Sequence, residues 1–525
     1  MKNHISINQL GYPRAGAKEA IFSGDADAFS LIDSVNNEAV FSGKASPALN
    51  IKAWGEKISV LDFSEVTLSG SFFLSVNQLG ANFRSGVFDI ASNPYVGLTE
   101  GMMQAFFANR CGFDTRRNDN THPHDTCHMN FNPHISRDFS GGYHDFAEYS
   151  RNVYSHAIGI AILIYSIIVN EVGNANMLLQ NRRTDNTDSI LNEIKYGLSW
   201  LLKMQDSDGG VFSGIETEKQ IDICYPEEDN AAYELIGKTV YSTVAFAGVT
   251  ALASWLFRKS DEGFSEKLRD AAVRAFIAYA EYSETHLIDF AREAKIATSA
   301  DCDFNGLRFW ALCELYALTG SEEFLTGAKK SIPADVCSFS PENAAGFGIL
   351  SIFLHPDGGD LELRRKTMFA LRVKADNLTS NSAKSFITLE DYNCFSNIKL
   401  MSDAITLFAA GAILKYPDYR VFGVRNFNYI LGANPLDKCF VTGFGHNPVR
   451  RPRHTLSTAF AESPPLAGMV VNGANNDRLH DNYLKWQLPR ATPPAKSYGD
   501  APSSLTTNAV TLPATALLYF LAAIV

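Results

Sequence analysis

The densest group of residues that could carry chemistry lies between Cys111 and His144. Five of the twelve histidines fall within this stretch, together with Cys127; they are His122, His124, His128, His134 and His144. Thiolate and imidazole are the ligand pair that suits Zn²⁺, and a closed set of four would hold a long irregular loop in place. The spacing Cys-x15-Cys-His-x15-His is not a standard zinc-finger spacing. A solvated, histidine-rich loop therefore stays open as the alternative.

Two carboxylates, Asp145 and Glu148, follow directly in the sequence. We expect a helix over residues 148–172, so the pair would stand at its entrance, lie on one face and share a water molecule. One carboxylate could then act as general base while the other orients the attacking water. The alternative is that both simply favour the positive end of a helix, an effect worth up to about 1 kcal/mol each.

The composition of the chain limits the class of protein that could carry these residues. It has 525 residues, 46% of them hydrophobic and 20% charged, which is typical of a globular protein with more than one core. Disordered, collagen-like and coiled-coil classes are excluded. The formal charge of −11 disfavours nucleic acid and anionic membranes as partners. Eight cysteines are too sparse for a disulfide scaffold.

Neither end of the chain suggests export or membrane insertion. Residues 1–6 contain no apolar segment of the length that a secretory signal needs, which predicts a cytoplasmic or already processed protein. Two apolar runs, 157–169 and 516–525, are shorter than the roughly 18 residues that a membrane span requires. We expect both to be buried core helices.

The first ninety or so residues are predicted to form a small β-sandwich. Short β-prone runs separated by Gly, Asn, Ser and Asp occur at residues 4–9, 19–22, 29–32, 58–62 and 70–76.

From Tyr95 onward the pattern is helical. Besides 148–172, helices are predicted over 95–110, 191–202, 239–257, 264–284, 307–319, 399–415 and 420–431, and at the C-terminus. Long helices joined by long irregular loops predict an all-α barrel or toroid with its chemistry on the loops. We therefore divide the chain into a sandwich at 1–92 and a helical domain at 93–525.

Several motifs, in order along nearly the whole chain, resemble glycoside hydrolase family 9, in the branch with an N-terminal immunoglobulin-like domain. They lie at residues 5–12, 105–112, 193–211, 308–320, 429–436 and 440–445. This resemblance implies an (α/α)6 barrel with an open substrate cleft across one end, preceded by an immunoglobulin-like sandwich. It also implies a structural zinc ion held by Cys111, Cys127, His128 and His144, which would anchor the backbone beside Asp145.

The resemblance also assigns catalytic positions, and this chain departs from them at two. Asp145 and Glu148 match the two aspartates that bind and activate the water, with Glu148 one methylene longer than the usual base. The family's proton donor is a glutamate after a Thr-Asn pair, whereas here Thr507-Asn508 is followed by Ala509. An alanine cannot protonate a leaving group, and inverting hydrolysis needs two carboxyl groups. By chain neighbourhood, replacement acids would be Asp500, Asp403 or Glu390.

The residues expected to contact sugar also depart from the family. A substrate-binding His-x-Arg is absent, and Arg453 and His454 are expected to take over some of its contacts. Of the loop aromatics, Tyr143, Tyr483 and Trp486 are assigned to sugar faces, although each could equally pack in the core. So few aromatics favour short oligosaccharides of β-linked glucose or amino sugars. An enzyme, a catalytically impaired sugar-binding barrel and a purely structural barrel all remain open.

Overall fold

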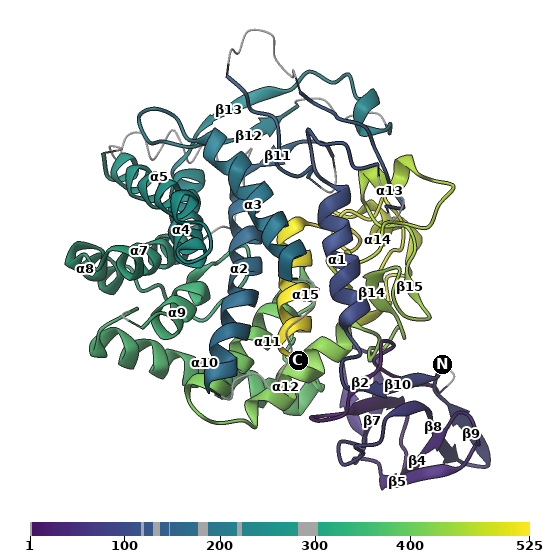
Figure 1. Cartoon of the computed structure of the whole chain (residues 1–525). Coiled ribbons are helices and arrows are strands. Elements are labelled where there is room, and N and C mark those ends of the chain that lie inside the picture. Colours follow the sequence, from purple (N-terminus) through teal and green to yellow (C-terminus); the bar gives the residue numbers. More distant parts are fainter. Residues whose placement is uncertain are drawn as a thin grey trace.

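The N-terminal part of the chain is a β-sandwich and the remainder is a helical barrel (Figure 1). The computed structural model describes residues 3–116, 120–129, 137–145, 148–176, 187–217, 223–281, 303–356 and 358–525. One sheet has the strand order β1-β3-β7-β6 and the other β2-β10-β8-β4-β5, with β9 paired to β8. The strands are β1 (Ile5–Ser6), β2 (Tyr12–Pro13), β3 (Glu19–Ser23), β4 (Ala28–Asp33), β5 (Ala39–Lys44), β6 (Leu49–Ile51), β7 (Glu56–Asp62), β8 (Gly70–Gln78), β9 (Ala81–Arg84) and β10 (Phe88–Ala91).

The sandwich forms because alternate residues of its strands are apolar and meet between the two sheets. Phe22 of β3, Leu31 of β4 and Leu74 of β8 are all completely buried there. The predicted all-β N-terminal unit is therefore confirmed.

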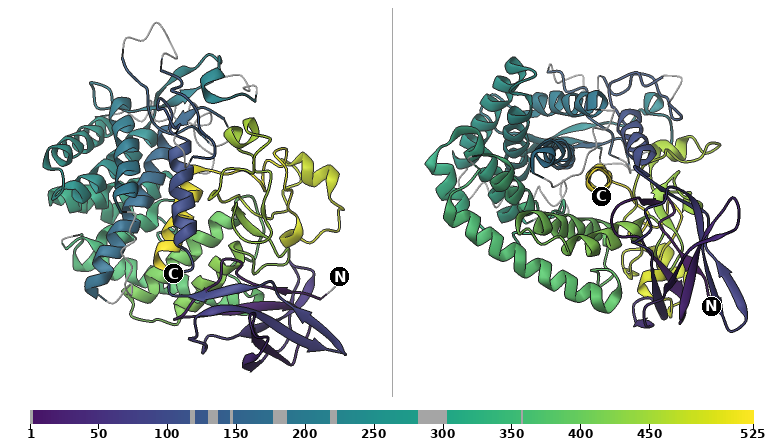
Figure 2. Two further views of the ribbon diagram at one scale, coloured as in Figure 1. Left: turned by 45° about the vertical axis from the view of Figure 1, so that its right-hand side comes forward. Right: turned by 60° about the horizontal axis from the view of Figure 1, so that its bottom comes forward.

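The helical part is a double ring. Its helices are α1 (Val96–Ala108), α2 (Val153–Asn176), α3 (Thr187–Met204), α4 (Val240–Phe257), α5 (Glu262–Glu281), α7 (Phe304–Thr319), α8 (Glu322–Lys330), α9 (Ala345–Leu354), α10 (Leu361–Ser385), α11 (Ser396–Ile413), α12 (Tyr419–Ile430) and α15 (Leu512–Ile524). Contacts run from α2 through α4, α7, α9 and α11 to α15, and α15 closes the inner ring on α2. The other helices pack outside them, as the view from below shows (Figure 2). The predicted (α/α)6 barrel is confirmed.

The inner helices are apolar on nearly all sides because they face both the ring interior and the outer helices. In α9 and α15 almost every residue is buried. One helix of the described residues, α4, is long and apolar enough to cross a membrane, and 83% of it is buried inside the fold.

The entrance to α2 differs from the prediction. Residues 148–152 do not begin the helix, because Arg151 and Asn152 form strand β11 and α2 starts at Val153. β11 pairs with β12 (Phe212–Glu216), which pairs with β13 (Glu234–Lys238), and this sheet lies over one end of the barrel (Figure 1). Backbone pairing with β12 has replaced the helical turn that the local sequence favoured.

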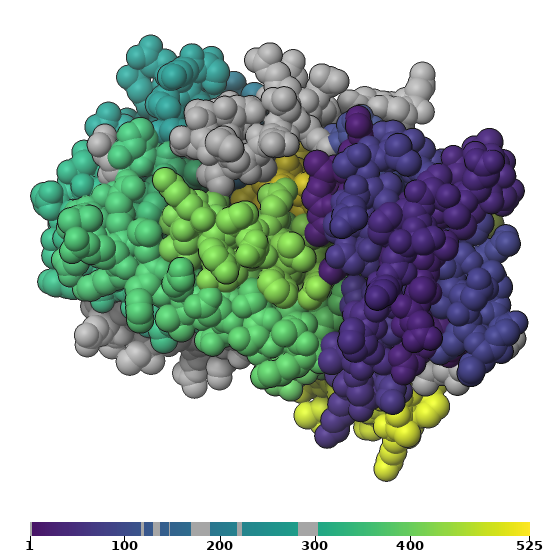
Figure 3. Space-filling view, turned by 90° about the horizontal axis from the view of Figure 1, so that it is seen from below, coloured from purple at the N-terminus to yellow at the C-terminus, as the bar shows by residue number. Residues whose placement is uncertain are grey.

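The sandwich is joined to the barrel by buried polar contacts. Asn8 donates to Asn428 Oδ1 (2.9 Å), and Trp54 donates to the Tyr392 hydroxyl (2.8 Å). Arg425 of α12 forms a bidentate ion pair with Glu19 of β3. Seen from below, the sandwich lies directly against the light-green part of the barrel (Figure 3). Breaking such pairs would leave buried polar groups without partners, so the two parts are fixed to each other.

Candidate active site and metal centre

Cys111 and His144 lie side by side because the end of α1 pairs with the loop that returns past it. The amide of Cys111 donates to Gly142 O, and the amide of His144 donates to Asn109 O, each at 2.8 Å. Gly142 has a φ of +78°, and a Cβ there would meet the Trp200 ring at 2.7 Å. The glycine is therefore required for this close approach.

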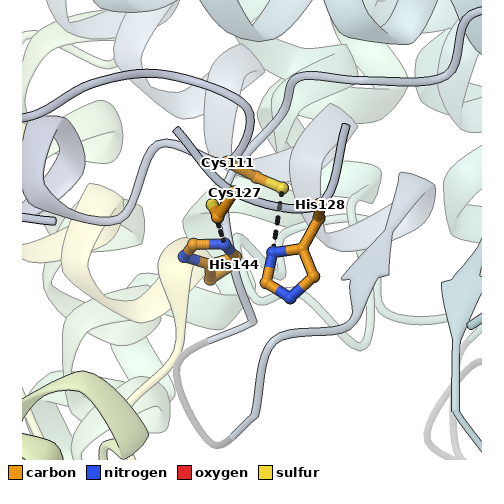
Figure 4. A group of neighbouring side chains, drawn as sticks. All are labelled: Cys111, Cys127, His128 and His144. Carbon is orange, nitrogen blue, oxygen red and sulfur yellow. Dashed lines mark hydrogen bonds between the residues drawn. The ribbon is translucent and has the colours of Figure 1, made fainter. Parts of the chain in front are cut away.

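Four side chains meet at this point: Cys111, Cys127, His128 and His144 (Figure 4). Their ligand atoms all lie within 4.8 Å of one another. Cys127 Sγ is 3.4 Å from His144 Nε2, and Cys111 Sγ is 3.7 Å from His128 Nδ1. Ligand atoms bound tetrahedrally to one Zn²⁺ at about 2.0–2.3 Å would lie about 3.3–3.8 Å apart. The donor set and these two separations therefore fit a closed zinc site.

Two of the four side chains, Cys111 and His144, have the ionisation state that binds zinc, whereas hydrogen bonding with Cys111 and burial raise the pKa of the Cys127 thiol and keep it protonated. Burial opposes ionisation of the Cys111 thiol, but hydrogen bonding with Cys127 and the charge of Arg151 outweigh it and hold its pKa well below the ordinary value. Burial lowers the pKa of His144 to about 4, so its imidazole is neutral. A thiolate and a neutral imidazole are the forms that bind zinc.

A second layer of side chains orients His128. Its Nε2 lies 3.2 Å from Asp229 Oδ2, and the Tyr233 hydroxyl donates to the same oxygen at 2.7 Å. Burial opposes the charged form of His128, but the hydrogen bonds to Asp229 and Cys111 raise its pKa to about 9. Carboxylates in this position commonly fix the orientation of a metal-binding histidine. No motif in the sequence marks Asp229 as a part of this site.

Two other histidines of the loop, His122 and His124, are not part of the cluster. The ring nitrogens of His124 lie 2.8 and 3.1 Å from the carbonyl oxygens of Asp125 and Ala108. His122 packs against Phe460. His134 lies outside the described residues. The first two are accounted for by packing and backbone hydrogen bonds.

Asp145 and Glu148 lie on a tight loop between the metal cluster and β11. The amide of Asp145 donates to Ser150 O (2.6 Å), and the amide of Glu148 donates to Asp145 O (3.0 Å). Both residues are partly exposed. The predicted shared helix face is therefore wrong, but the loop still places two carboxylates three residues apart, directly after His144.

A further carboxyl, Glu216 at the end of β12, stands beside this pair. Burial and the charges of Glu148 and, less strongly, Asp145 raise its pKa to about 7, although a hydrogen bond with Asn152 opposes the shift. The pairing of β11 with β12 brings these residues together from distant parts of the sequence. No local motif in the sequence marks Glu216.

The segment that ends at Ala509 is held by its backbone and its buried neighbours. Thr506 donates to Asp481, Thr507 Oγ1 accepts from the Gly499 amide (3.1 Å), and Asn508 accepts from the Tyr498 hydroxyl. Ala509 itself is partly exposed, and its carbonyl accepts from the Asn472 amide (3.0 Å).

Arg453 and His454 have different environments. Arg453 is partly exposed, and its amide donates to Asn508 O (2.9 Å), directly beside Ala509. His454 is buried, caps α13 (Thr455–Ala459) through Ser457, and places Nε2 3.0 Å from Asn109 Oδ1. Burial lowers the pKa of His454 to about 3. The prediction that it contacts sugar is therefore corrected: it joins the Ala509 region to the residue that also holds His144.

The three aromatics assigned to sugar faces also differ. Tyr143 is 1% exposed, stacks on His156 and donates its hydroxyl to Glu193, so it packs in the core instead. Tyr483 is partly exposed on α14 (Asn482–Gln487), where its ring lies against Gly499. Trp486 on the same helix is 71% exposed. Of the three, Trp486 presents the most open ring.

Of the three replacement acids suggested by chain neighbourhood, Asp500 and Asp403 are engaged in other contacts. Asp500 forms an ion pair with Lys438 (3.0 Å) and accepts from the amides of Arg450 and Arg451. Asp403 is buried in α11 and accepts from Thr388 (2.8 Å). Glu390 is exposed after the end of α10.

Comparisons with known proteins agree with this arrangement. The family model "Glycosyl hydrolase family 9" matches residues 95–522, and "Cellulase N-terminal ig-like domain" matches residues 1–81. The chain is 26% identical to a cellodextrinase of Butyrivibrio fibrisolvens over 97% of each chain. It is 28% identical to a xyloglucan-specific endo-beta-1,4-glucanase of Bacteroides ovatus, over 99% of this chain and 93% of the other.

A solved structure gives the same result for the fold. AaCel9A in complex with cellobiose-like isofagomine superposes with a TM-score of 0.85 at 25% identity, over 99% of both chains. The family match covers the barrel from α1 to α15, the loop of Asp145 and the segment of Ala509 alike. This chain therefore belongs to glycosyl hydrolase family 9 and carries the immunoglobulin-like N-terminal domain of its cellulases.

Proposed function

We propose that this protein is an inverting glycosidase that acts on short β-linked glucan or amino-sugar oligosaccharides, with Glu148 as general base and Asp145 as its water partner. The observation that carries the proposal is the hydrogen-bonded backbone at Asp145 and Glu148. The amide of Asp145 donates to Ser150 O, that of Glu148 donates to Asp145 O, and the preceding residue, His144, is held by Asn109. A positioned pair of carboxylates can orient a water for attack at the anomeric carbon and accept its proton.

Zinc has a structural role in this proposal. Cys111, Cys127, His128 and His144 would hold it, and when bound it supplies a cross-link between the end of α1 and the loop before Asp145. The orientation of Asp145 would then depend on the cluster. The chemistry on the substrate belongs to the carboxyl groups.

The preference for short substrates rests on the few aromatic rings that are open to solvent. Trp486 on α14 is open enough to stack on a sugar ring, and the partly exposed Tyr483 on the same helix and Arg453 beside Ala509 are candidates for hydrogen bonds. The similarity to a cellodextrinase supports a substrate of this kind. A single exposed aromatic ring can stack on few sugar units, which suits a short oligosaccharide better than a polymer surface.

A second candidate function is favoured by Ala509. If no group donates a proton to the leaving oxygen, the barrel would bind oligosaccharides without cleaving them and would serve as a sensor or scaffold. General acid catalysis typically contributes about 10²–10⁴-fold to the rate, so its loss would leave little activity on unactivated substrates.

The decisive experiment compares hydrolysis and binding in the zinc-loaded protein. Cello-oligosaccharides of two to six units are incubated with the parent and with Glu148→Gln, and the products are followed by chromatography while calorimetry measures binding. The glycosidase proposal expects turnover by the parent, with the α-anomer as the first product, and none by the variant. Binding without turnover in the parent would favour the sensor or scaffold instead.

A further inference from the structure

The position of Glu216 gives it access to the catalytic loop. In the antiparallel pairing of β11 with β12, Asn152 is opposite Gly214 and Arg151 is opposite Ile215. The next position along the two chains brings Glu216 to the level of Ser150, whose carbonyl holds the amide of Asp145. Glu216 is thus placed at the Asp145–Glu148 loop by a strand that does not belong to that loop.

The charges around Glu216 are mainly negative. Glu148 and Asp145 act on it from the catalytic loop, and Glu234 is its partner in the register with β13. Glu234 is exposed, so water screens its effect. Asn152 on β11 forms a hydrogen bond with Glu216 and favours its charged form.

Partial burial, together with the negative charges of Glu148 and Asp145, favours the neutral form of the Glu216 carboxyl group. With its pKa raised to about 7, a large fraction of Glu216 carries its proton in neutral solution and nearly all of it does in mildly acidic solution. A carboxylic acid held neutral beside ionised carboxylates is the arrangement that glycosidases use to separate an acid from a base.

We propose that Glu216 donates the proton to the glycosidic oxygen, in place of the carboxyl group that is absent at Ala509. This inference rests on the proposed glycosidase function. In the reaction the bond between C1 and the glycosidic oxygen breaks, and that oxygen takes the proton of Glu216. Water attacks C1 and gives its proton to Glu148. The cycle closes when the proton on Glu148 leaves to solvent and Glu216 takes one up.

The pH dependence of the reaction follows from this assignment. Glu216 is competent while it is protonated, so its acid form is present below about pH 7 and is lost as the pH rises through its pKa. The rate on natural oligosaccharides should therefore fall above about pH 7. A substrate whose leaving group needs no proton should not show this fall.

The test measures kcat/KM of the parent, Glu216→Gln and Glu234→Gln on cellotetraose and on 2,4-dinitrophenyl β-cellobioside, from pH 4 to 9. Glu234→Gln is the matched control, because it makes the same substitution at the neighbouring exposed position. We expect Glu216→Gln to have a kcat/KM on cellotetraose that is lower by about 10²–10⁴-fold, and nearly the parent kcat/KM on the dinitrophenyl substrate. The decrease in kcat/KM above about pH 7 should be absent in this variant. Glu234→Gln should behave as the parent does.

Three other results would overturn the proposal, and they are distinguishable. If the parent cleaves cellotetraose and Glu216→Gln cleaves it equally well, another group donates the proton and the glycosidase function stands. If the kcat/KM of Glu216→Gln falls equally on both substrates while its melting temperature is unchanged, Glu216 positions the loop and is not the acid. If the parent cleaves neither substrate, the proposed function fails, and the assignment of Glu216 fails with it.

Discussion

The loop that carries Asp145 and the segment that carries Ala509 retain different parts of the family's site. The loop keeps the chemical groups of its motif, with two thiols, two imidazoles and two carboxylates, although Glu148 stands where the motif has an aspartate. The segment retains its hydrogen-bonding frame, since Thr506, Thr507 and Asn508 are buried and bonded, but it has no carboxyl group.

This difference follows from what each residue does for the fold. The side chains before Ala509 satisfy buried polar partners, so their replacement would cost about 1–3 kcal/mol for each partner left unpaired. Ala509 contributes its backbone and is partly exposed. The fold therefore tolerates a change at this position, and under the proposed function the change would alter chemistry without altering structure.

The largest expected effect is a loss of kcat when Glu148, on the loop that carries Asp145, is substituted. Glu148→Gln should lower kcat by at least about 10²–10⁴-fold on both natural and activated substrates, because the amide keeps the shape and cannot accept a proton. Calorimetry should show oligosaccharide binding near that of the parent. A Glu148→Gln protein with the parent rate would show that the loop does not supply the base.

The segment can be tested by returning a carboxyl group to it. In the Glu216→Gln background, Ala509→Glu should recover part of the lost 10²–10⁴-fold in kcat/KM on cellotetraose. The hydrogen-bonded residues that would orient the new carboxyl group are still in place. Ala509→Gln in the same background is the matched control and should recover nothing. Equal rates for the Glu and Gln variants would mean that position 509 does not face the reacting bond.

Metal removal tests whether the loop depends on its cluster. We expect about one zinc per chain, bound through thiolates and imidazoles. At a metal concentration 1,000 times its Kd, chelation should cost about 4 kcal/mol of folding free energy and lower the melting temperature.

Cys127→Ser should abolish zinc in elemental analysis, whereas Cys337→Ser, at a buried cysteine outside the cluster, should not. Identical zinc content in the two variants would rule out the cluster.

The smallest expected effect concerns the buried hydrogen bonds that hold the segment before Ala509. Asp481 is buried and accepts hydrogen bonds from Leu484, Ser504 and Thr506. Asp481→Asn should lower the free energy of unfolding by about 1–3 kcal/mol, because an amide cannot accept all of them. Chemical denaturation measures this loss, and zinc content should stay unchanged. A fall in zinc content would mean that the two regions are not independent.

Much of the fold could be predicted because long helices carry their own signal. The predicted helices at 239–257, 307–319 and 420–431 agree with α4, α7 and α12 to within a few residues. The start of α2 was misplaced, since strand pairing of Arg151 and Asn152 with β12 is a long-range interaction that helical periodicity does not contain. Tyr143 was misassigned for a related reason. An aromatic beside a catalytic motif faces the cleft or the core according to its neighbours in space.

The sequence by itself determined the family, the barrel and sandwich, the two carboxylates and the four residues of the cluster, because each depends on residue type and order. It also determined that position 509 holds no acid. Only the tertiary structure decided that Asp229 supports His128, that His454 is a buried cap, and that Glu216 stands near Asp145 and Glu148. The physical reason is that burial and charge act through space, so a carboxyl group takes its protonation state from neighbours that the fold alone brings near.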